Sequence, residues 1–389
     1  MNKEQEIMLS CLRAYYNQSA PEEFDGFEPE RLYLEARSHN LSATIFAIMK
    51  NNPTLQSSKN AYKAFEDDFF DCIFRYDAQK AVIDEIHTLL SDNGIKHIFF
   101  KGSEIKEYYP APELRVMGDI DILIEKENRK KVLELMKGAG FEAKNTNGPV
   151  YDYEKGGVLV EMHSRLVNGK VGSKSAQDYF CDAFAHAEFD GFLGHFEPTY
   201  YTAYLITHIA HHFWFYGAGV KMIFDLAIVM RHFNVNADDV LKLLDEIELG
   251  DFSKTVFTVC SKWFGAGKAY GCDTKKTERF LLDNGAFGNV NRDPAVIARR
   301  KALEEGDESA FMAKLHLAFP PYGKMKELPY IKFMEGRPYL LPIGWIYRII
   351  YNLKNRTEYT KSATESLSDR KTLKCAQDEI KYFEEIGLI

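Results

Sequence analysis

Two aspartates, Asp119 and Asp121, lie one residue apart in the segment GDIDILI, whose isoleucine and leucine residues otherwise predict a buried strand. Because successive side chains of a strand alternate between its faces, both carboxylates project from the same face, roughly 7 Å apart along the backbone. Neighbouring carboxylates repel one another and resist ionisation unless a positive charge lies between them. The spacing therefore points to a bound divalent cation.

A third acid, Glu161, interrupts the apolar segment VLVEMH at residues 158–163. If this segment joins the same sheet beside the aspartate-bearing strand, three carboxylates can meet. Such hard oxygen ligands suit Mg²⁺, or Mn²⁺ in its place, and substrate phosphates complete the coordination. Ions held in this way activate an attacking oxygen and stabilise the leaving one, which is the chemistry of phosphoryl or nucleotidyl transfer.

Four upstream residues offer contacts to phosphate. Gly102 permits close backbone approach, and Ser103 can cap a short helix whose first amides face an anion. Lys101 is a point charge at a strand end, and Arg115 can hold a phosphate with a bidentate fork. Both cations can instead form structural ion pairs with the aspartates, and the sequence leaves these two roles open.

Further polar residues are weaker candidates. His163 shares the strand face of Glu161 and has either a supporting role behind the metal ligands, a role towards substrate, or a purely structural one. His208 and His212 are one turn apart on a predicted helix, but no glutamate completes an HExxH motif, which argues against a zinc protease. These histidines either pack at a domain junction or face the site.

Lys221 and Asp225 are also one helical turn apart. The spacing fits a simple ion pair on a helix, and it also fits two residues that line the floor of a cleft.

The surrounding pattern predicts the elements that position these side chains. Apolar residues at intervals of three and four predict helices up to Asn93-Gly94, which supplies a stop. The pattern then predicts strands at 95–100 and 119–124, a helix in ENRKKVLELMKGAGF, and a hairpin with arms at 150–154 and 158–164. The helical period returns from about residue 198. We therefore expect a mixed α+β protein with an N-terminal helical region (1–72), an α/β domain (73–197) and a larger C-terminal helical domain (198–389).

The composition of the chain limits the kinds of molecule that it is expected to bind. With 57 acidic and 49 basic residues the net charge is -8, which argues against a broad nucleic-acid or anionic-membrane footprint. The six cysteines show no CxxC spacing, so neither a zinc site nor a disulfide framework is indicated. The N-terminus lacks the apolar core of a signal peptide, and no apolar stretch approaches the roughly 20 residues of a membrane span. We expect a soluble, cytoplasmic protein.

The order of a Gly-Ser turn, an Asp-x-Asp strand and a later acid resembles the nucleotidyltransferase superfold of polymerase β and the aminoglycoside nucleotidyltransferases. The segments FFKGSEIKEYYPAPELRVMGDIDILI and LVEMHSRL look like a bacterial group described as uncharacterised nucleotidyltransferases. The likeness continues through ITHIAHHFWFYGAGVKMIFDLAIV and LPIGWIYRIIYNL, so that it covers about residues 75–355. Lys101 and the long gap from Ser103 to Asp119 depart from the wider superfold and fit the narrower group.

This resemblance implies a small nucleotidyltransferase-fold sheet with flanking helices. It assigns Asp119, Asp121 and Glu161 to metal and the Gly102-Ser103 turn to phosphate. The implied reaction is Mg²⁺-dependent transfer of a nucleoside monophosphate from an NTP to a small-molecule or protein acceptor, with release of pyrophosphate.

Three alternatives accompany this reading. One is a nucleotide-binding regulatory protein without turnover. A second is a nucleotidyltransferase that modifies protein or RNA, with RNA disfavoured by the acidic net charge. The third is a metal phosphohydrolase, for which more histidine would be expected near the aspartates.

Overall fold

The computed structural model describes residues 1–22, 24, 26–167, 176–215, 217–286, 294–304, 314–315, 318–326, 328, 330–334, 336–355, 367 and 369–389. The chain divides into two compact units, one of Met1–Ala143 with Asp152–Asn289 and the other of Lys144–Tyr151 with Val290–Ile389. All candidate residues named above belong to the first unit. The three-domain division expected from the sequence stays a prediction.

The described residues contain a seven-stranded mixed sheet with the strand order β3-β4-β5-β2-β1-β7-β6. Its strands are β1 (His97–Phe100), β2 (Asp119–Ile124), β3 (Glu142–Asn145), β4 (Val150–Lys155), β5 (Val158–His163), β6 (Ala187–Asp190) and β7 (Leu193–Phe196). The central strand β2 pairs antiparallel with β1 and parallel with β5. With the many helices around it, this sheet confirms the predicted mixed α+β class.

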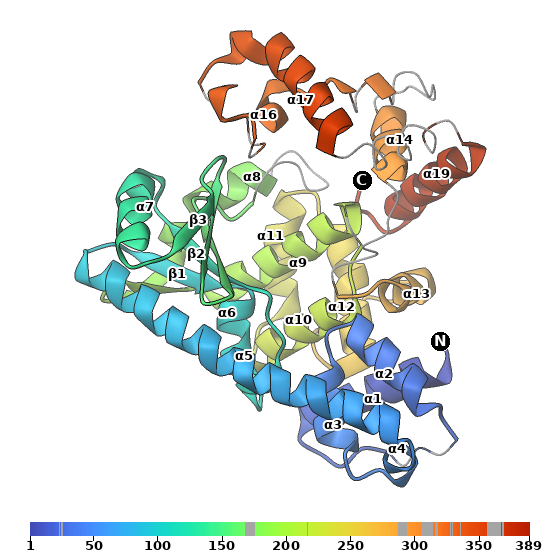
Figure 1. The fold of residues 1–389 in the computed structure, drawn as a ribbon. Helices are drawn as coiled ribbons and strands as arrows, with labels where there is room; N and C mark the ends of the chain where they lie inside the picture. Colours follow the sequence, from blue (N-terminus) through green and yellow to red (C-terminus); the bar gives the residue numbers. More distant parts are fainter. Residues whose placement is uncertain are drawn as a thin grey trace. The chain divides into compact units, whose positions relative to one another are not determined.

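Helices precede and follow the sheet in the first unit (Figure 1). Before it come α1 (Lys3–Asn17), α2 (Pro29–Ser38), α3 (Ser42–Met49), α4 (Pro53–Ser57) and α5 (Lys59–Asp92). Within it lie α6 (Gly102–Ile105), α7 (Arg129–Gly138) and α8 (Ala176–Tyr179), and after it come α9 (Pro198–Phe215), α10 (Val220–His232), α11 (Ala237–Glu246), α12 (Gly250–Phe264) and α13 (Lys275–Asp283).

The long helix α5 joins the N-terminal helices to the sheet. The side chain of Ser58 caps its first turn by accepting from the amide of Ala61 at 3.3 Å, and Gly94 follows its end with a φ of 69°. The helix contacts α2 and α3 near its start and β5 of the sheet, and Figure 1 shows it running between these parts. Helix α5 therefore connects the N-terminal helices to the sheet.

The predicted strands at 119–124 and in the hairpin are present, whereas β3, β6 and β7 were missed. Each missed strand has four residues, which is too short for an alternation to stand out. Strands β6 and β7 form an antiparallel pair around Gly191, which has a φ of 60°, and β7 extends the sheet by parallel pairing with β1. The sheet is therefore wider than the sequence suggests.

The second unit contains α14 (Pro294–Glu304), α16 (Tyr322–Met325), α17 (Leu341–Asn355) and α19 (Arg370–Glu385). Helix α14 packs on α19, and Arg300 Nη1 lies 2.7 Å from Glu379 Oε2. A separate apolar cluster joins Met325, Ile331 and Met334. Across the parts of the chain that the structure describes, no helix has the length and apolarity needed to cross a membrane.

A buried ion pair ties helix α10 to the segment that leads into β2. The Nε and Nη2 atoms of Arg115 each donate to the carboxylate of Asp225 at 2.8 Å, and the hydroxyl of Tyr109 donates to the same carboxylate at 2.5 Å. Burial pushes the Asp225 pKa upward, but the charges of Arg115 and Lys221 outweigh it and lower this pKa to about 2. The contact joins residues that are 110 positions apart in the chain.

Replacing Asp225 with asparagine should destabilise the first unit substantially. The D225N variant leaves the Arg115 charge buried without its carboxylate, which typically costs about 3–5 kcal/mol. Denaturant unfolding of the full chain measures the loss. The matched control is Asp84→Asn, because Asp84 pairs with Lys80 at 3.3 Å on an exposed stretch of α5, where we expect a change below about 0.5 kcal/mol.

The same pair predicts a pH dependence. Because the folded pKa of Asp225 is depressed, its contribution to stability is present above the ordinary value of 3.8 and is lost as the pH falls through about 2. The stability gap between wild type and D225N should therefore persist down to mildly acidic pH and narrow below it. A gap that closes already near neutral pH would contradict this assignment.

Candidate functional site

The parallel pairing of β2 with β5 fixes how the acids meet. In this register Asp121 lies beside Glu161, and Asp119 lies beside Leu159. Paired residues of neighbouring parallel strands project from the same face, and residues two apart on one strand share that face. The aspartates and Glu161 therefore lie on one side of the sheet, as the sequence prediction requires.

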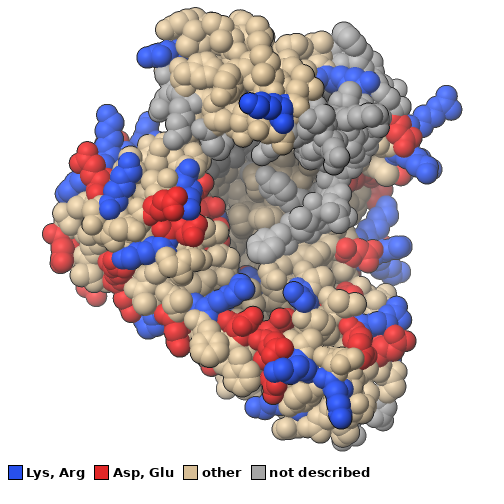
Figure 2. All heavy atoms as spheres, in the orientation of Figure 1, with Lys and Arg blue, Asp and Glu red and all other residues tan. Residues whose placement is uncertain are grey.

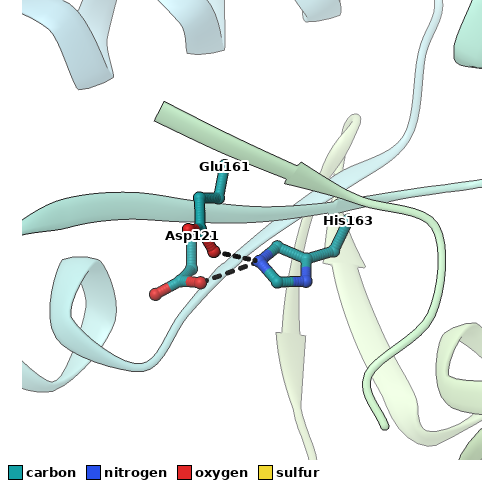
Figure 3. A group of neighbouring side chains, drawn as sticks. All are labelled: Asp121, Glu161 and His163. Carbon is teal, nitrogen blue, oxygen red and sulfur yellow. Dashed lines mark hydrogen bonds and ion pairs between the residues drawn. The ribbon is translucent and has the colours of Figure 1, made fainter. Parts of the chain in front are cut away.

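His163 completes a compact cluster with two of these acids (Figure 3). Its Nε2 atom lies 2.8 Å from Asp121 Oδ1 and 3.2 Å from Glu161 Oε2. One ligand atom from each of the three residues lies within 4.8 Å of the others. Two carboxylate oxygens and an imidazole nitrogen at this spacing fit a divalent cation. Asp119 is on the same face but outside this group.

Lys101 provides a positive charge against the cluster. Its Nζ atom lies 2.7 Å from Asp121 Oδ1, the same oxygen that His163 contacts. The lysine has a φ of 52° and a ψ of -126°, a backbone conformation that costs a residue other than glycine about 1–3 kcal/mol. The surrounding structure holds the side chain in this position at the end of β1.

The electrostatic environment gives the three carboxylates different pKa values. Burial, followed by the charges of Asp121 and Glu161, raises the pKa of Asp119 to about 6. Burial also acts to raise the pKa of Asp121, but the Lys101 charge and the hydrogen bond from His163 lower it overall. The hydrogen bond from His163 lowers the pKa of Glu161. Asp119 is therefore the acid that takes up a proton most easily.

The pKa of His163 is raised, whereas the pKa values of Asp121 and Glu161 are lowered. Burial acts to lower its pKa, but the hydrogen bonds to Asp121 and Glu161 raise it overall. The imidazole is 6% exposed, and its ring packs edge-on against Phe100 with 5.1 Å between ring centroids. Its orientation between the two acids is therefore fixed by packing.

The Gly102-Ser103 turn packs against β2 and the segment before it. The hydroxyl of Ser103 contacts the backbone oxygens of Phe100 at 2.8 Å and Asp121 at 3.1 Å. A Cβ atom on Gly102 would lie 2.9 Å from Met117 Cγ, so only glycine fits here without movement. The turn is thus held close to the acids, and its role in binding phosphate stays a prediction.

A cavity of about 240 Å³ adjoins the acid face. Residues from the turn, the segment before β2 and β2 itself form one wall, and residues from α9 and α10 form the other. The sequence candidates in its lining are Lys101, Gly102, Arg115, Asp119, Asp121, His208, His212, Lys221 and Asp225. The cavity is therefore lined both by the sheet region and by the helices that follow it.

Two histidines of α9 lie in the cavity wall as neutral imidazoles. Their ring centroids are 4.6 Å apart. Burial lowers the pKa of His212 to about 4, and burial together with the neighbouring His212 lowers the pKa of His208 well below its ordinary range. At neutral pH these side chains can each donate or accept a hydrogen bond without adding charge.

Lys221 is the cation of α10 in this wall. Its Nζ atom lies 3.6 Å from Asp225 Oδ2, and Arg115 already donates to that oxygen at 2.8 Å. Burial and then the Arg115 charge lower the Lys221 pKa to about 8. The ammonium is therefore buried against the cavity with a long contact to its acid.

The structure joins the sequence candidates into two sets of direct contacts. The structure brings Asp121, Glu161, His163 and Lys101 into direct contact. It joins Arg115 to Asp225 rather than to the aspartates of β2. Sequence reasoning missed Tyr109, which donates to Asp225, because a tyrosine beside Pro110 gives no sign of a partner 116 residues away.

The surface offers little sign of a polyanion footprint on the face that Figure 2 shows. Lysine and arginine side chains alternate there with aspartate and glutamate side chains over the described residues. Such interspersed charge fits the net charge of -8 and small substrates better than a long nucleic acid.

Comparison with known proteins identifies one relationship. The model of a family described as uncharacterised nucleotidyltransferase matches residues 25–265, which is more than half of the 389-residue chain. No curated protein matches the chain, and no solved structure matches it. The matched range contains every candidate residue and begins and ends earlier than the range of about 75–355 expected from the sequence.

Replacing Lys101 with methionine should make the first unit dependent on a divalent cation. The K101M variant removes a charge that offsets three neighbouring carboxylates, so we expect a loss of roughly 3 kcal/mol in EDTA. Millimolar Mg²⁺ or Mn²⁺ should then raise the melting temperature of K101M more than that of wild type, because the ion replaces the missing charge.

Thermal melts with and without metal measure this difference. Lys80→Met is the matched control, since Lys80 forms an exposed ion pair with Asp84 on α5 rather than with an acid of the sheet. If K101M gains no more from metal than wild type does, Lys101 does not compete with a cation at this site.

Proposed function

This chain belongs to the uncharacterised nucleotidyltransferase family, and from that premise we propose that it transfers a nucleoside monophosphate from an NTP to an acceptor hydroxyl. The observation that carries the proposal is the convergence of Asp121, Glu161 and His163 on one face of the sheet, beside a cavity. A hard-ligand cluster next to a cavity is what a metal-dependent phosphate chemistry requires.

In this proposal the carboxylates of Asp119, Asp121 and Glu161 hold Mg²⁺ or Mn²⁺. A bound divalent ion would neutralise phosphate charge and support in-line displacement at phosphorus. Asp121 and Glu161 remain ionised at neutral pH because their pKa values are lowered. Glu161, with 36% of its side chain exposed, is the cluster member best able to align an incoming acceptor.

The cavity wall supplies the contacts to the nucleotide. Arg115 donates to Asp225 through Nε and Nη2 and to the carbonyl of Gly102 through Nη1, and we assign it the role of holding the wall in position. Lys221 has donor capacity left and is the cation we assign to a phosphate oxygen. The neutral imidazoles of His208 and His212, together with the apolar lining, suit the uncharged part of the ligand.

The bond changes follow from the proposed reaction. The acceptor hydroxyl passes its proton to the Glu161 carboxylate or to water and its oxygen forms a bond to the α-phosphorus, the bond from that phosphorus to the oxygen bridging to the β-phosphate breaks, and pyrophosphate leaves. The Gly102-Ser103 turn would hold the departing phosphates, as the family resemblance implies. The acceptor is a small molecule or a protein in this proposal.

Neutralising either aspartate should strongly weaken metal-dependent nucleotide binding. Asp119→Asn and Asp121→Asn should each weaken binding of Mg²⁺ with a non-hydrolysable NTP by about tenfold or more, because each removes a negative charge from the cation site. Isothermal calorimetry measures the affinity, and circular dichroism checks the fold. Glu188→Gln, which changes an exposed acid on edge strand β6, should bind like wild type. Unchanged binding by both aspartate variants would refute the site.

Pyrophosphate release separates an enzyme from a regulatory nucleotide-binding protein. The wild-type protein with Mg²⁺ or Mn²⁺, labelled NTPs and a pool of hydroxyl-bearing acceptors should release pyrophosphate, and the D121N variant should not. Label transferred to a macromolecule identifies a protein or RNA acceptor, whereas label in a small product identifies a small molecule. NTP binding without pyrophosphate release under any of these conditions would favour the regulatory alternative.

A further inference from the structure

The imidazole of His163 lies where a third metal ligand would be. Figure 3 shows its Nε2 edge directed at the space between Asp121 and Glu161. The two separations, 2.8 Å to Asp121 Oδ1 and 3.2 Å to Glu161 Oε2, are nearly equal. The ring therefore faces both acids at once rather than supporting one of them from behind.

These separations match the edges of a coordination octahedron. Bonds of about 2.1 Å from an octahedral ion leave adjacent ligand atoms roughly 3 Å apart. The observed separations lie on either side of that value. Since the two carboxylate oxygens also lie within 4.8 Å of each other, one ion that takes the place of Lys101 Nζ beside Asp121 Oδ1 can contact Nε2 and both oxygens.

The strands and the packing around His163 keep this nitrogen in position. Glu161 and His163 are two residues apart on β5, so they share the face that also carries Asp121. The ring is 6% exposed and packs against Phe100. A side chain so enclosed cannot turn its Nε2 atom away to solvent without disturbing the core beside it.

The chemical types of the ligand atoms determine which metal ions fit this site. Mg²⁺ strongly prefers oxygen ligands, whereas imidazole nitrogen suits first-row transition metals. Mn²⁺ accepts carboxylates, phosphates and water as Mg²⁺ does and also binds imidazole. A site with two carboxylates and one imidazole is therefore better matched to Mn²⁺.

Resting on the proposed function, we infer that His163 is a metal ligand through Nε2 and that the site favours Mn²⁺ over Mg²⁺. When Nε2 binds the ion, the proton that it shares with the two carboxylates leaves to water, and the ring keeps its proton on Nδ1. Asp121 and Glu161 supply oxygen ligands beside it, Asp119 contributes as in the proposed function, and a nucleotide phosphate or water fills the remaining positions.

Pulsed electron paramagnetic resonance of the Mn²⁺-loaded full chain tests this inference directly. Wild type with Mn²⁺ alone, and again with Mn²⁺ and a non-hydrolysable NTP, should show electron spin-echo modulation from a directly bound ¹⁴N nucleus. Protein grown with ¹⁵N-histidine should show the modulation at the ¹⁵N frequency instead. This second measurement needs no substitution, so it does not depend on the folding of a variant.

Two variants identify the histidine. H163Q keeps a hydrogen-bonding side chain and offers an oxygen in place of the nitrogen, so the nitrogen modulation should disappear while Mg²⁺ still binds. The preference for Mn²⁺ over Mg²⁺, measured as a ratio of dissociation constants by competition, should fall about tenfold or more. H195Q is the matched control, because His195 also faces an acid, Glu104 at 3.4 Å, but does so outside the cluster.

The outcomes separate the inference from the proposed function. Mn²⁺ binding without nitrogen modulation in wild type would overturn the role of His163 and leave a metal-dependent nucleotidyltransferase with oxygen ligands alone. An unchanged metal preference in a folded H163Q would also overturn it. If neither Mn²⁺ nor Mg²⁺ binds, with or without the NTP analogue, the proposed function and the inference both fail.

Discussion

The central constraint in this structure is the burial of negative charge on one face of a sheet. Asp121 is 3% exposed and lies in register with Glu161 on the parallel neighbour. A buried carboxylate with an acidic neighbour is tolerated only if positive groups reach it. The protein meets this requirement with Lys101 at the end of β1 and His163 on β5, and the positions of both follow from the pairing of β1, β2 and β5.

Three cations line the cavity: Lys101, Arg115 and Lys221. Their contacts differ in ways that the sequence does not show. Lys101 compensates the acids of the sheet, and Arg115 holds α10 to the segment before β2. Lys221 shares Asp225 with Arg115 at a longer distance, which leaves it the most available to a ligand. The family match covers all three of these residues, so this division of roles lies inside the region that defines the family.

Sequence reasoning predicted the elements that carry strong local patterns. The alternation in residues 119–124 and 158–163 is long enough to identify both strands, and the acids interrupting them are conspicuous among apolar neighbours. The sequence does not predict the register of β2 against β5. No local pattern of residues shows that Glu161 lies beside Asp121 or that His163 lies between the two acids. The same holds for the contact of Arg115 with Asp225, whose partners come together only when the helices after the sheet pack against it.

The contact of Arg115 with Asp225 also limits how the cavity can work. It connects the two walls, so moving them apart would expose or unpair a buried guanidinium and carboxylate at a cost of several kcal/mol. A hinge that opens the cavity at these walls is therefore disfavoured. A ligand of the proposed function would therefore enter and leave between walls that this ion pair holds together.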